Sequence, residues 1–160
     1  MTAQILDRTL TAYRIGDPAG VFPIFDASGS TVAPGRWNTP GSPVIYASAH
    51  FSTAVLEKLV HGSGRLPPNQ HYIEITVQRG ASYEIFSPPS LQGWDAMPPT
   101  VSKSFGEQWC LERRSAILIV PSIIARLDSN VLINPAHPEF PTIMSSLHQP
   151  AYWDRRLFGL

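Results

Sequence analysis

The distribution of hydrophobic positions along the chain predicts several short strands. Residues 71–78 alternate apolar and more polar side chains, which is typical of a strand that buries one face. Continuous apolar runs at 44–47, 116–120 and 131–133 are rich in β-branched residues and end close to a proline or a turn. These three runs predict short buried strands.

Two other segments have the pattern of helices. Apolar residues recur at helical spacing over 49–61, with Ser48 placed to cap the start and Gly62 to end the helix. A second helix is predicted over 104–113, because its first four residues, Ser-Phe-Gly-Glu, match a capping box. Short mixed strands with two or three helices predict an α+β fold.

The segment 17–43 predicts a long ordered loop. It is rich in Gly, Pro, Ser and Asp, and we expect turns at Gly29 and at Pro34-Gly35. Long loops within compact domains are often functional. The prolines are spread along the chain and no internal repeat is visible, so we expect one domain over 1–160.

Composition and charge narrow the class of protein. At 160 residues, with 43% apolar and 15% charged residues, the chain can bury a sizeable core and should fold unaided. Twelve basic residues balance twelve acidic ones, which argues against a direct nucleic-acid or anionic-membrane partner. The single cysteine, the lack of a signal-peptide pattern and the lack of a long apolar run predict a cytoplasmic protein.

One candidate site lies in the long loop, just before the strand that carries Tyr46. Arg36 could direct its guanidinium at a phosphate or carboxylate, and Trp37 could lie beside a planar ring. Alternatively, Arg36 is a surface residue whose stem rests on Trp37. Tyr46 could likewise fill the core at a strand end.

Glu57 is a second candidate, because it lies close to the apolar stripe of the predicted helix. A carboxylate at the edge of a core face needs a partner or a function. The alternative is an exposed helical Glu beside Lys58. Ser122 follows a buried strand, where its hydroxyl could face a pocket or cap the segment after it.

The sequence contains no recognisable metal or nucleotide motif. The five histidines lack the short paired spacing of a zinc or iron site, so we expect no metal cofactor. A phosphate-binding P-loop and a G-x-G-x-x-G turn after a strand are also missing. A dinucleotide, if bound, is therefore not held in the Rossmann manner.

Several short motifs, taken in order along the chain, resemble the RES domain family, which is named for its Arg, Glu and Ser. They are Tyr13-Arg14, Gly35-Arg36-Trp37-Asn38, Val44-Ile45-Tyr46, Leu56-Glu57 with Val60-His61, Val120-Pro121-Ser122, Asn134-Pro135-Ala136-His137-Pro138 and Trp153-Asp154 with Arg156-Leu157-Phe158. The resemblance runs from about Tyr13 to Phe158, nearly the whole chain.

The resemblance implies a fold similar to ADP-ribosyltransferases and the role of a toxin in a type II toxin–antitoxin system that depletes NAD. It implies NAD as substrate, and an Xre-type antitoxin with which the toxin forms a hetero-oligomer. By resemblance the family's Arg, Tyr, Glu and Ser fall on Arg36, Tyr46, Glu57 and Ser122, with Arg14 as a further substrate contact.

These residue types suit cleavage of the nicotinamide–ribose bond. The pyridinium leaves as a neutral molecule, so no general acid is needed, and one carboxylate, Glu57, could stabilise the developing ribosyl cation. In this hypothesis Arg36, with Arg14, clamps phosphate and Tyr46 packs on the nicotinamide ring, while Ser122 positions substrate. The remaining substrate-binding candidates are Tyr13, Trp37 and Asn38.

The sequence leaves the acceptor open. Water or inorganic phosphate would make the protein an NAD glycohydrolase or phosphorylase, whereas a protein acceptor would make it an ADP-ribosyltransferase. A binding module that senses a nucleotide without cleaving it is an alternative from another class. A nuclease toxin fits poorly with zero net charge and no metal cluster.

Overall fold

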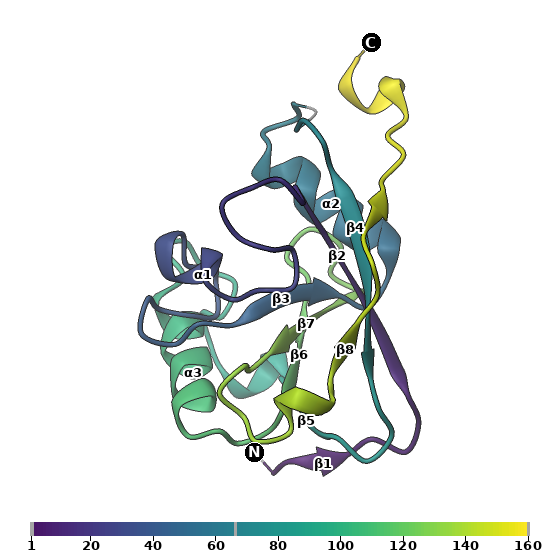
Figure 1. Ribbon diagram of the computed structural model, residues 1–160. Helices are drawn as coiled ribbons and strands as arrows, with labels where there is room; N and C mark the ends of the chain where they lie inside the picture. Colours follow the sequence, from purple (N-terminus) through teal and green to yellow (C-terminus); the bar gives the residue numbers. More distant parts are fainter. Residues whose placement is uncertain (1, 66, 160) are drawn as a thin grey trace.

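The computed structural model describes residues 2–65 and 67–159, which are built around one mixed sheet (Figure 1). The strands are β1 (Gln4–Ile5), β2 (Leu10–Gly16), β3 (Ile45–Ser48), β4 (His71–Val77), β5 (Ser82–Ile85), β6 (Ile117–Pro121), β7 (Ser129–Ile133), β8 (Met144–Ser145) and β9 (Gln149–Pro150). Their order is β1-β5-β6-β7-β3-β2-β4-β8, and β9 also pairs with β4. Strands β5 and β6 pair in parallel, and the other pairs are antiparallel.

Helices and short 3-10 turns connect these strands. The α-helices are α1 (Gly29–Val32), α2 (Phe51–His61) and α3 (Thr100–Leu111), and the 3-10 turns are Pro88–Ser90, Phe140–Thr142 and Arg155–Phe158. The predicted α+β fold is thus confirmed. In Figure 1, α1 and α3 lie to one side of the sheet, and the chain after β9 extends away from the body.

The central strands are buried on both faces, because alternate side chains join different apolar clusters. Along β6, Ile117 packs into the larger cluster, whereas Leu118 and Val120 pack into a second cluster with Trp109 of α3. Side chains of a strand alternate between the two faces of a sheet. This double burial explains why β6 and β7 appear in the sequence as continuous apolar runs.

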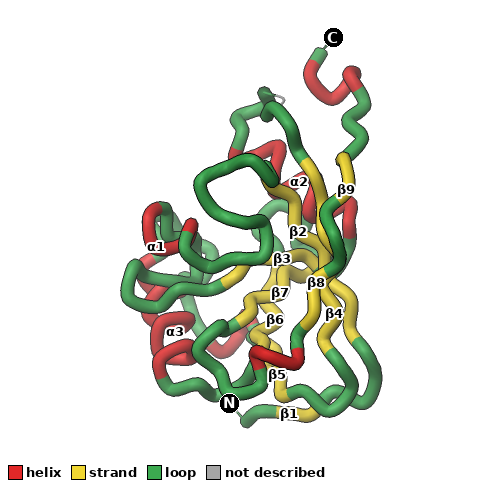
Figure 2. Tube along the Cα trace, viewed as in Figure 1, coloured by secondary structure: helices red, strands yellow, loops and turns green. Residues whose placement is uncertain are grey.

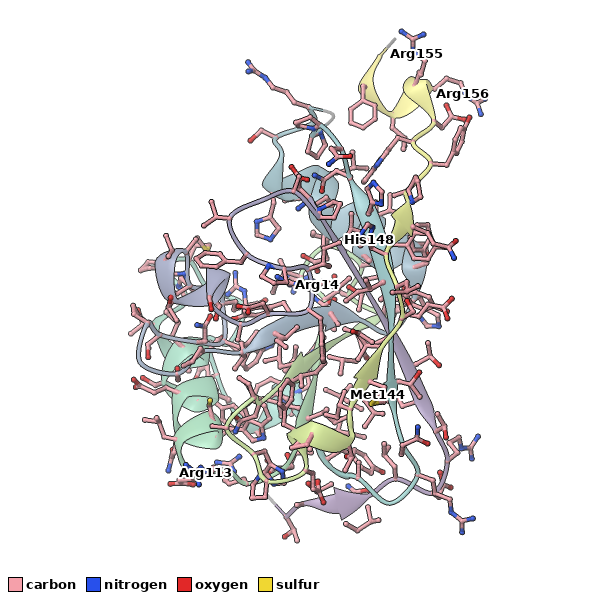
Figure 3. The ribbon with its side chains drawn as sticks, in the orientation of Figure 1. Arg14, Arg113, Met144, His148, Arg155 and Arg156 are labelled. Atoms are coloured by element: carbon pink, nitrogen blue, oxygen red, sulfur yellow. The ribbon has the colours of Figure 1, made fainter. Side chains whose placement is uncertain are left out.

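The predicted strands at 44–47, 71–78, 116–120 and 131–133 correspond to β3, β4, β6 and β7 within one or two residues at each end. Strand β2 was not predicted. Its alternation is irregular, since polar Arg14 is turned into the body of the molecule, as Figure 3 shows.

Both helix starts differ from the prediction. The N-cap of α2 is His50 and no side chain caps it, because the Ser48 hydroxyl donates to Asn130 instead. Helix α3 begins at Thr100, directly after Pro99, so the expected capping box lies inside the helix. A proline before the first helical residue is compatible with a helix start. The carboxylate of the expected capping box, Glu107, instead accepts a hydrogen bond from the Thr39 hydroxyl.

The loop 17–43 is ordered, as predicted, and it contains α1 where a turn at Gly29 was expected (Figure 2). Its last part, around Trp37, packs against α3 at Gly106. A side chain at position 106 would clash with the Trp37 carbonyl, so glycine permits this contact. None of the described helices is long and apolar enough to span a membrane.

Candidate active site

A cavity opens where β2 and β3 separate. These strands pair at one position, Tyr13 with Ser48, and then diverge. The cavity of about 870 Å³ is bounded by β2, β3, α2, the loop around Arg36 and the segment after β6. This volume is within the range of ligand sites for small organic molecules.

The lining of this cavity is rich in cationic side chains. Arg14, Arg36, Lys58 and Lys103 all contribute to it, and Glu57 is the one carboxylate among the lining residues that the structure describes. A cavity with this balance favours an anionic ligand, while Glu57 offers one negative group to any positive charge that develops in it.

Glu57 lies on α2 and is held through one of its carboxylate oxygens. Oε1 accepts hydrogen bonds from the Ser122 hydroxyl, at 2.9 Å, and from the Asn130 amide, at 2.7 Å. No described residue donates to Oε2. Two donors on one oxygen orient the carboxylate and leave the other oxygen available to a ligand in the cavity.

Asn130 was not predicted as a site residue, although it lines the cavity beside Glu57. It pairs with Ser48 across β7 and β3, and the Ser48 hydroxyl donates to its Oδ1 at 2.8 Å. This contact fixes the amide with Nδ2 toward Glu57. The only signal in the sequence is a polar residue directly before an apolar run, which is too common to single it out.

Of the two alternatives considered for Ser122, the structure shows the cap, and the hydroxyl also binds Glu57. Its hydroxyl donates to Glu57 and accepts from the backbone N–H groups of Ile124, at 3.2 Å, and Ala125, at 3.1 Å. The side chain is fully buried and lies outside the cavity lining. Ser122 therefore acts on the carboxylate and on the turn after β6, and it has no direct access to a ligand in this structure.

Arg36 lines the cavity and is anchored to the loop that precedes α3. Its Nη1 donates to the carbonyls of Trp94, at 3.1 Å, and Ala96, at 2.8 Å, and Nη2 contacts the Met97 sulfur at 3.3 Å. Arg36 is thus neither a free surface arginine nor a side chain resting only on Trp37. Part of its hydrogen-bonding capacity is used within the protein.

Tyr46 is held at its hydroxyl and is one of the residues that line the cavity. The hydroxyl donates to Asn38 Oδ1 at 2.7 Å and accepts from the Trp37 backbone N–H at 3.0 Å. Burial is the main reason why the pKa of Tyr46 lies well above its ordinary value. A side chain at Gly35 would come within 2.6 Å of the tyrosine ring, so glycine lets this loop cross it.

Trp37 and Asn38 mainly build the loop that holds Arg36. Trp37 is 3% exposed and its ring packs edge-on against Phe86, although the residue still contributes to the cavity lining. Asn38 is fully buried, bonds Gly35 and Tyr46 through Oδ1, and lies outside the lining. The structure does not bring Asn38 to a position from which it could contact a ligand directly.

Arg14 lies where β2 leaves β3, inside the body of the molecule (Figure 3). Its Nε donates to the Ile24 carbonyl and its Nη1 to the Tyr46 carbonyl, each at 2.7 Å. Burial lowers the pKa of Arg14, and Asp26 partly opposes this effect. Tyr13, the neighbouring residue, also lines the cavity and packs edge-on against Phe51.

The structure adds Lys58, Lys103 and Asn130 to the predicted site residues. A lysine on an amphipathic helix is usually solvated, so neither lysine stands out in the sequence. Across the described ranges, no three or more His, Cys, Asp or Glu side chains are grouped so that they could hold a metal ion.

The RES domain model matches residues 11–154. The chain belongs to the RES domain family. A protein of Sphingobium sp. (strain YBL2) named Prs ADP-ribosylating toxin is 40% identical over 93% of this chain and 97% of its own length. A protein of Photorhabdus laumondii named Toxin Res is 30% identical over 80% of this chain and 83% of its own length.

A solved structure has the same fold at low sequence identity. This RES-domain chain superposes on a chain of the M. tuberculosis MbcT-MbcA toxin-antitoxin complex with a TM-score of 0.68 and 14% identity, over 92% of this chain and 86% of the other. At this identity the likeness establishes the fold and leaves the activity to be argued from the site.

Proposed function

We propose that this RES-domain protein is the toxin of a toxin–antitoxin pair and that it breaks the nicotinamide–ribose bond of NAD. The observation that carries this proposal is the arrangement of Glu57. Its Oε1 is fixed by Ser122 and Asn130, while Oε2 has no protein donor among the described residues. The names of the relatives, which are toxins, support the biological role.

The chemistry requires a positioned carboxylate and anion-binding groups. When the bond to nicotinamide breaks, positive charge develops on the ribose and the leaving group departs neutral, so protonation of the leaving group is unnecessary. A preoriented carboxylate stabilises that charge without reorganising during the reaction. The cationic lining would bind the phosphates of the dinucleotide, and the Tyr46 ring would pack against nicotinamide.

The ADP-ribose group could pass to water, to inorganic phosphate or to a protein. Hydrolysis or phosphorolysis requires only room beside the anomeric carbon, whereas protein modification also requires a surface that the target recognises. The relative that is 40% identical bears the name Prs ADP-ribosylating toxin, which favours a protein acceptor as the second candidate function.

Products of the purified protein would separate these activities. The protein is incubated with NAD, with and without inorganic phosphate, and the products are identified by mass spectrometry. A parallel reaction contains cell extract and NAD labelled in its adenine, with Glu57→Gln as the control. Free or phosphorylated ADP-ribose supports hydrolysis or phosphorolysis, and label on a protein supports transfer. Intact NAD in every reaction would contradict the proposed function.

The partner would be an antitoxin, and by family resemblance one of the Xre type. An arginine-lined cavity is suited to an inserted carboxylate or acidic segment. We expect such an antitoxin to bind more weakly when a non-hydrolysable NAD analogue fills the cavity, which calorimetry on the complex would measure. Unchanged affinity would place the inhibitory contact elsewhere.

A further inference from the structure

Two cationic side chains share one part of the cavity without a carboxylate partner. Arg14 of β2 and Lys58 of α2 both line it, and among the described residues neither forms an ion pair. Arg14 donates to two backbone carbonyls, which are neutral acceptors. Lys58 donates to no side chain or backbone group in the described part of the chain.

The surroundings of these two cations compensate their charges only in part, through Asp26 near Arg14 and Asp17 near Lys58. Burial is the main cause of the lowered pKa of Lys58, the positive charge of Arg14 lowers it further, and Asp17 partly opposes both. The other titratable side chains that line the cavity with Lys58 are Glu57 and His61 of its own helix and, from other elements, Tyr13, Arg36, Tyr46 and Lys103. Cations kept together in a half-buried site destabilise the free protein unless an anion binds there.

We propose that Arg14 and Lys58 form the binding site for the diphosphate group of the dinucleotide. A diphosphate carries negative charge on two adjacent phosphoryl groups, which matches two neighbouring cations better than a single carboxylate does. This inference rests on the proposed use of NAD and goes beyond it: the family resemblance implied Arg14 with Arg36 as phosphate contacts, whereas the structure pairs Arg14 with Lys58 and so assigns a role to Lys58.

The position of Lys58 next to Glu57 supports this assignment. Both residues line the cavity from α2, so a ligand that places its ribose at Glu57 has its neighbouring phosphates close to Lys58. Arg36 has both terminal nitrogens engaged by Trp94, Ala96 and Met97, whereas Arg14 has an Nη2 with no acceptor among the described residues. Arg36 then anchors the loop 94–97 beside the ligand.

The first test measures the protonation of Lys58 directly. The chain has two lysines, Lys58 and Lys103, so an isotope label at lysine Cε gives two NMR signals, which Lys58→Arg assigns. We expect the Lys58 signal to titrate below the usual range for lysine. Saturating ADP-ribose, which has the diphosphate but cannot lose nicotinamide, should shift that titration to higher pH, because the bound anion favours the charged amine.

The second test compares the affinity of matched variants for ADP-ribose by calorimetry. Lys58→Gln should bind roughly ten- to a hundredfold more weakly, the range expected for losing a hydrogen bond to a charged group. Arg79→Gln removes one positive charge from an exposed position outside the cavity and should bind as the wild type does. Adenosine, which lacks phosphate, should not distinguish Lys58→Gln from Arg79→Gln.

The pH dependence of ADP-ribose binding tests whether the charged form of Lys58 is the form that binds. As pH rises through the lowered pKa of Lys58, the wild type should lose affinity for ADP-ribose, because the amine becomes neutral. Lys58→Arg should keep its affinity, since arginine stays protonated. Lys58→Gln should also unfold at a temperature no lower than wild type, because it removes a poorly compensated charge, and this confirms that weak binding is not caused by misfolding.

These outcomes separate the inference from the proposed function. If ADP-ribose leaves the Lys58 titration unchanged, or Lys58→Gln binds it as tightly as Arg79→Gln, the diphosphate assignment is wrong even where the protein cleaves NAD. If ADP-ribose shifts the Lys58 titration but NAD stays intact, the binding site stands and the proposed activity fails.

Discussion

Two neighbouring residues of α2, Glu57 and Lys58, line the same cavity but differ in how the protein holds their charged groups. Glu57 is fixed by two neutral donors, Ser122 and Asn130, on one oxygen. Lys58 has no hydrogen-bond or ion-pair partner within the described residues, and the charged neighbour with the largest effect on its pKa, Arg14, is another cation. The carboxylate of Glu57 is therefore held by hydrogen bonds before a ligand arrives, whereas the amine of Lys58 is not.

The difference indicates what each side contributes. A carboxylate that must stabilise a short-lived cation gains from being held in place in advance, since it need not reorganise during the reaction. Cations that bind a stable anion can receive their compensating negative charge from the ligand itself. We expect substitutions on the Glu57 side to lower kcat and substitutions on the Arg14–Lys58 side to weaken substrate binding.

The largest effect on the Glu57 side should come from Glu57→Gln. The amide keeps an oxygen that can accept from Ser122 and Asn130, so the fold should persist, but the negative charge is lost. We expect kcat for NAD cleavage to fall roughly 100- to 1000-fold, and growth inhibition on expression to disappear. Near-normal NAD loss by a folded variant would show that another group stabilises the cation.

Replacing Arg36 tests the loop 94–97, which Arg36 anchors beside the cavity. Arg36→Ala should lower kcat/KM by about 100-fold, as displaced positioning groups do, because the loop 94–97 loses three contacts. Arg36→Lys should recover only part, since an ammonium cannot reproduce the geometry of the guanidinium fork. Steady-state kinetics on NAD would measure this, and full recovery by lysine would mean that charge alone matters at this position.

Removing one donor from Glu57 should have a smaller effect, confined to kcat. Asn130→Ala should lower kcat roughly tenfold with little change in KM, the scale of one hydrogen bond to a charged group. Ser122→Ala should cause a similar loss and also reduce stability by about 1 kcal/mol, because it caps the turn after β6. Ser48→Ala is the matched control. It keeps both donors to Glu57 and loses only the hydrogen bond that orients the Asn130 amide.

The smallest change in activity is expected for Tyr46→Phe. The ring remains available to pack on nicotinamide, so NAD cleavage should stay within a few-fold of wild type. The Trp37 N–H loses its acceptor and Asn38 Oδ1 keeps only the Gly35 N–H, which should lower the free energy of unfolding by about 1–3 kcal/mol. Chemical denaturation measures the stability, and a large loss of turnover at normal stability would assign the hydroxyl a role in the reaction.

The central strands could be predicted from the sequence because they are buried on both faces and so appear as unbroken apolar runs. Strand β2 escaped prediction because Arg14 interrupts its pattern, and the burial of that guanidinium depends on the Ile24 and Tyr46 carbonyls, which lie far from it in sequence. The starts of α2 and α3 were also misplaced, since Ser48 and Glu107 form tertiary hydrogen bonds instead of caps.

The sequence by itself determined the α+β fold class, the family resemblance and the selection of Arg36, Tyr46 and Glu57, because strand patterns and short motifs are local. Only the tertiary structure decided which side chains meet in the cavity. Asn130 reaches Glu57 from 73 positions away along the chain, and Lys58 is set beside Arg14 by the packing of α2 on β2. Contacts of this kind depend on the relative placement of whole elements, which residue spacing does not encode.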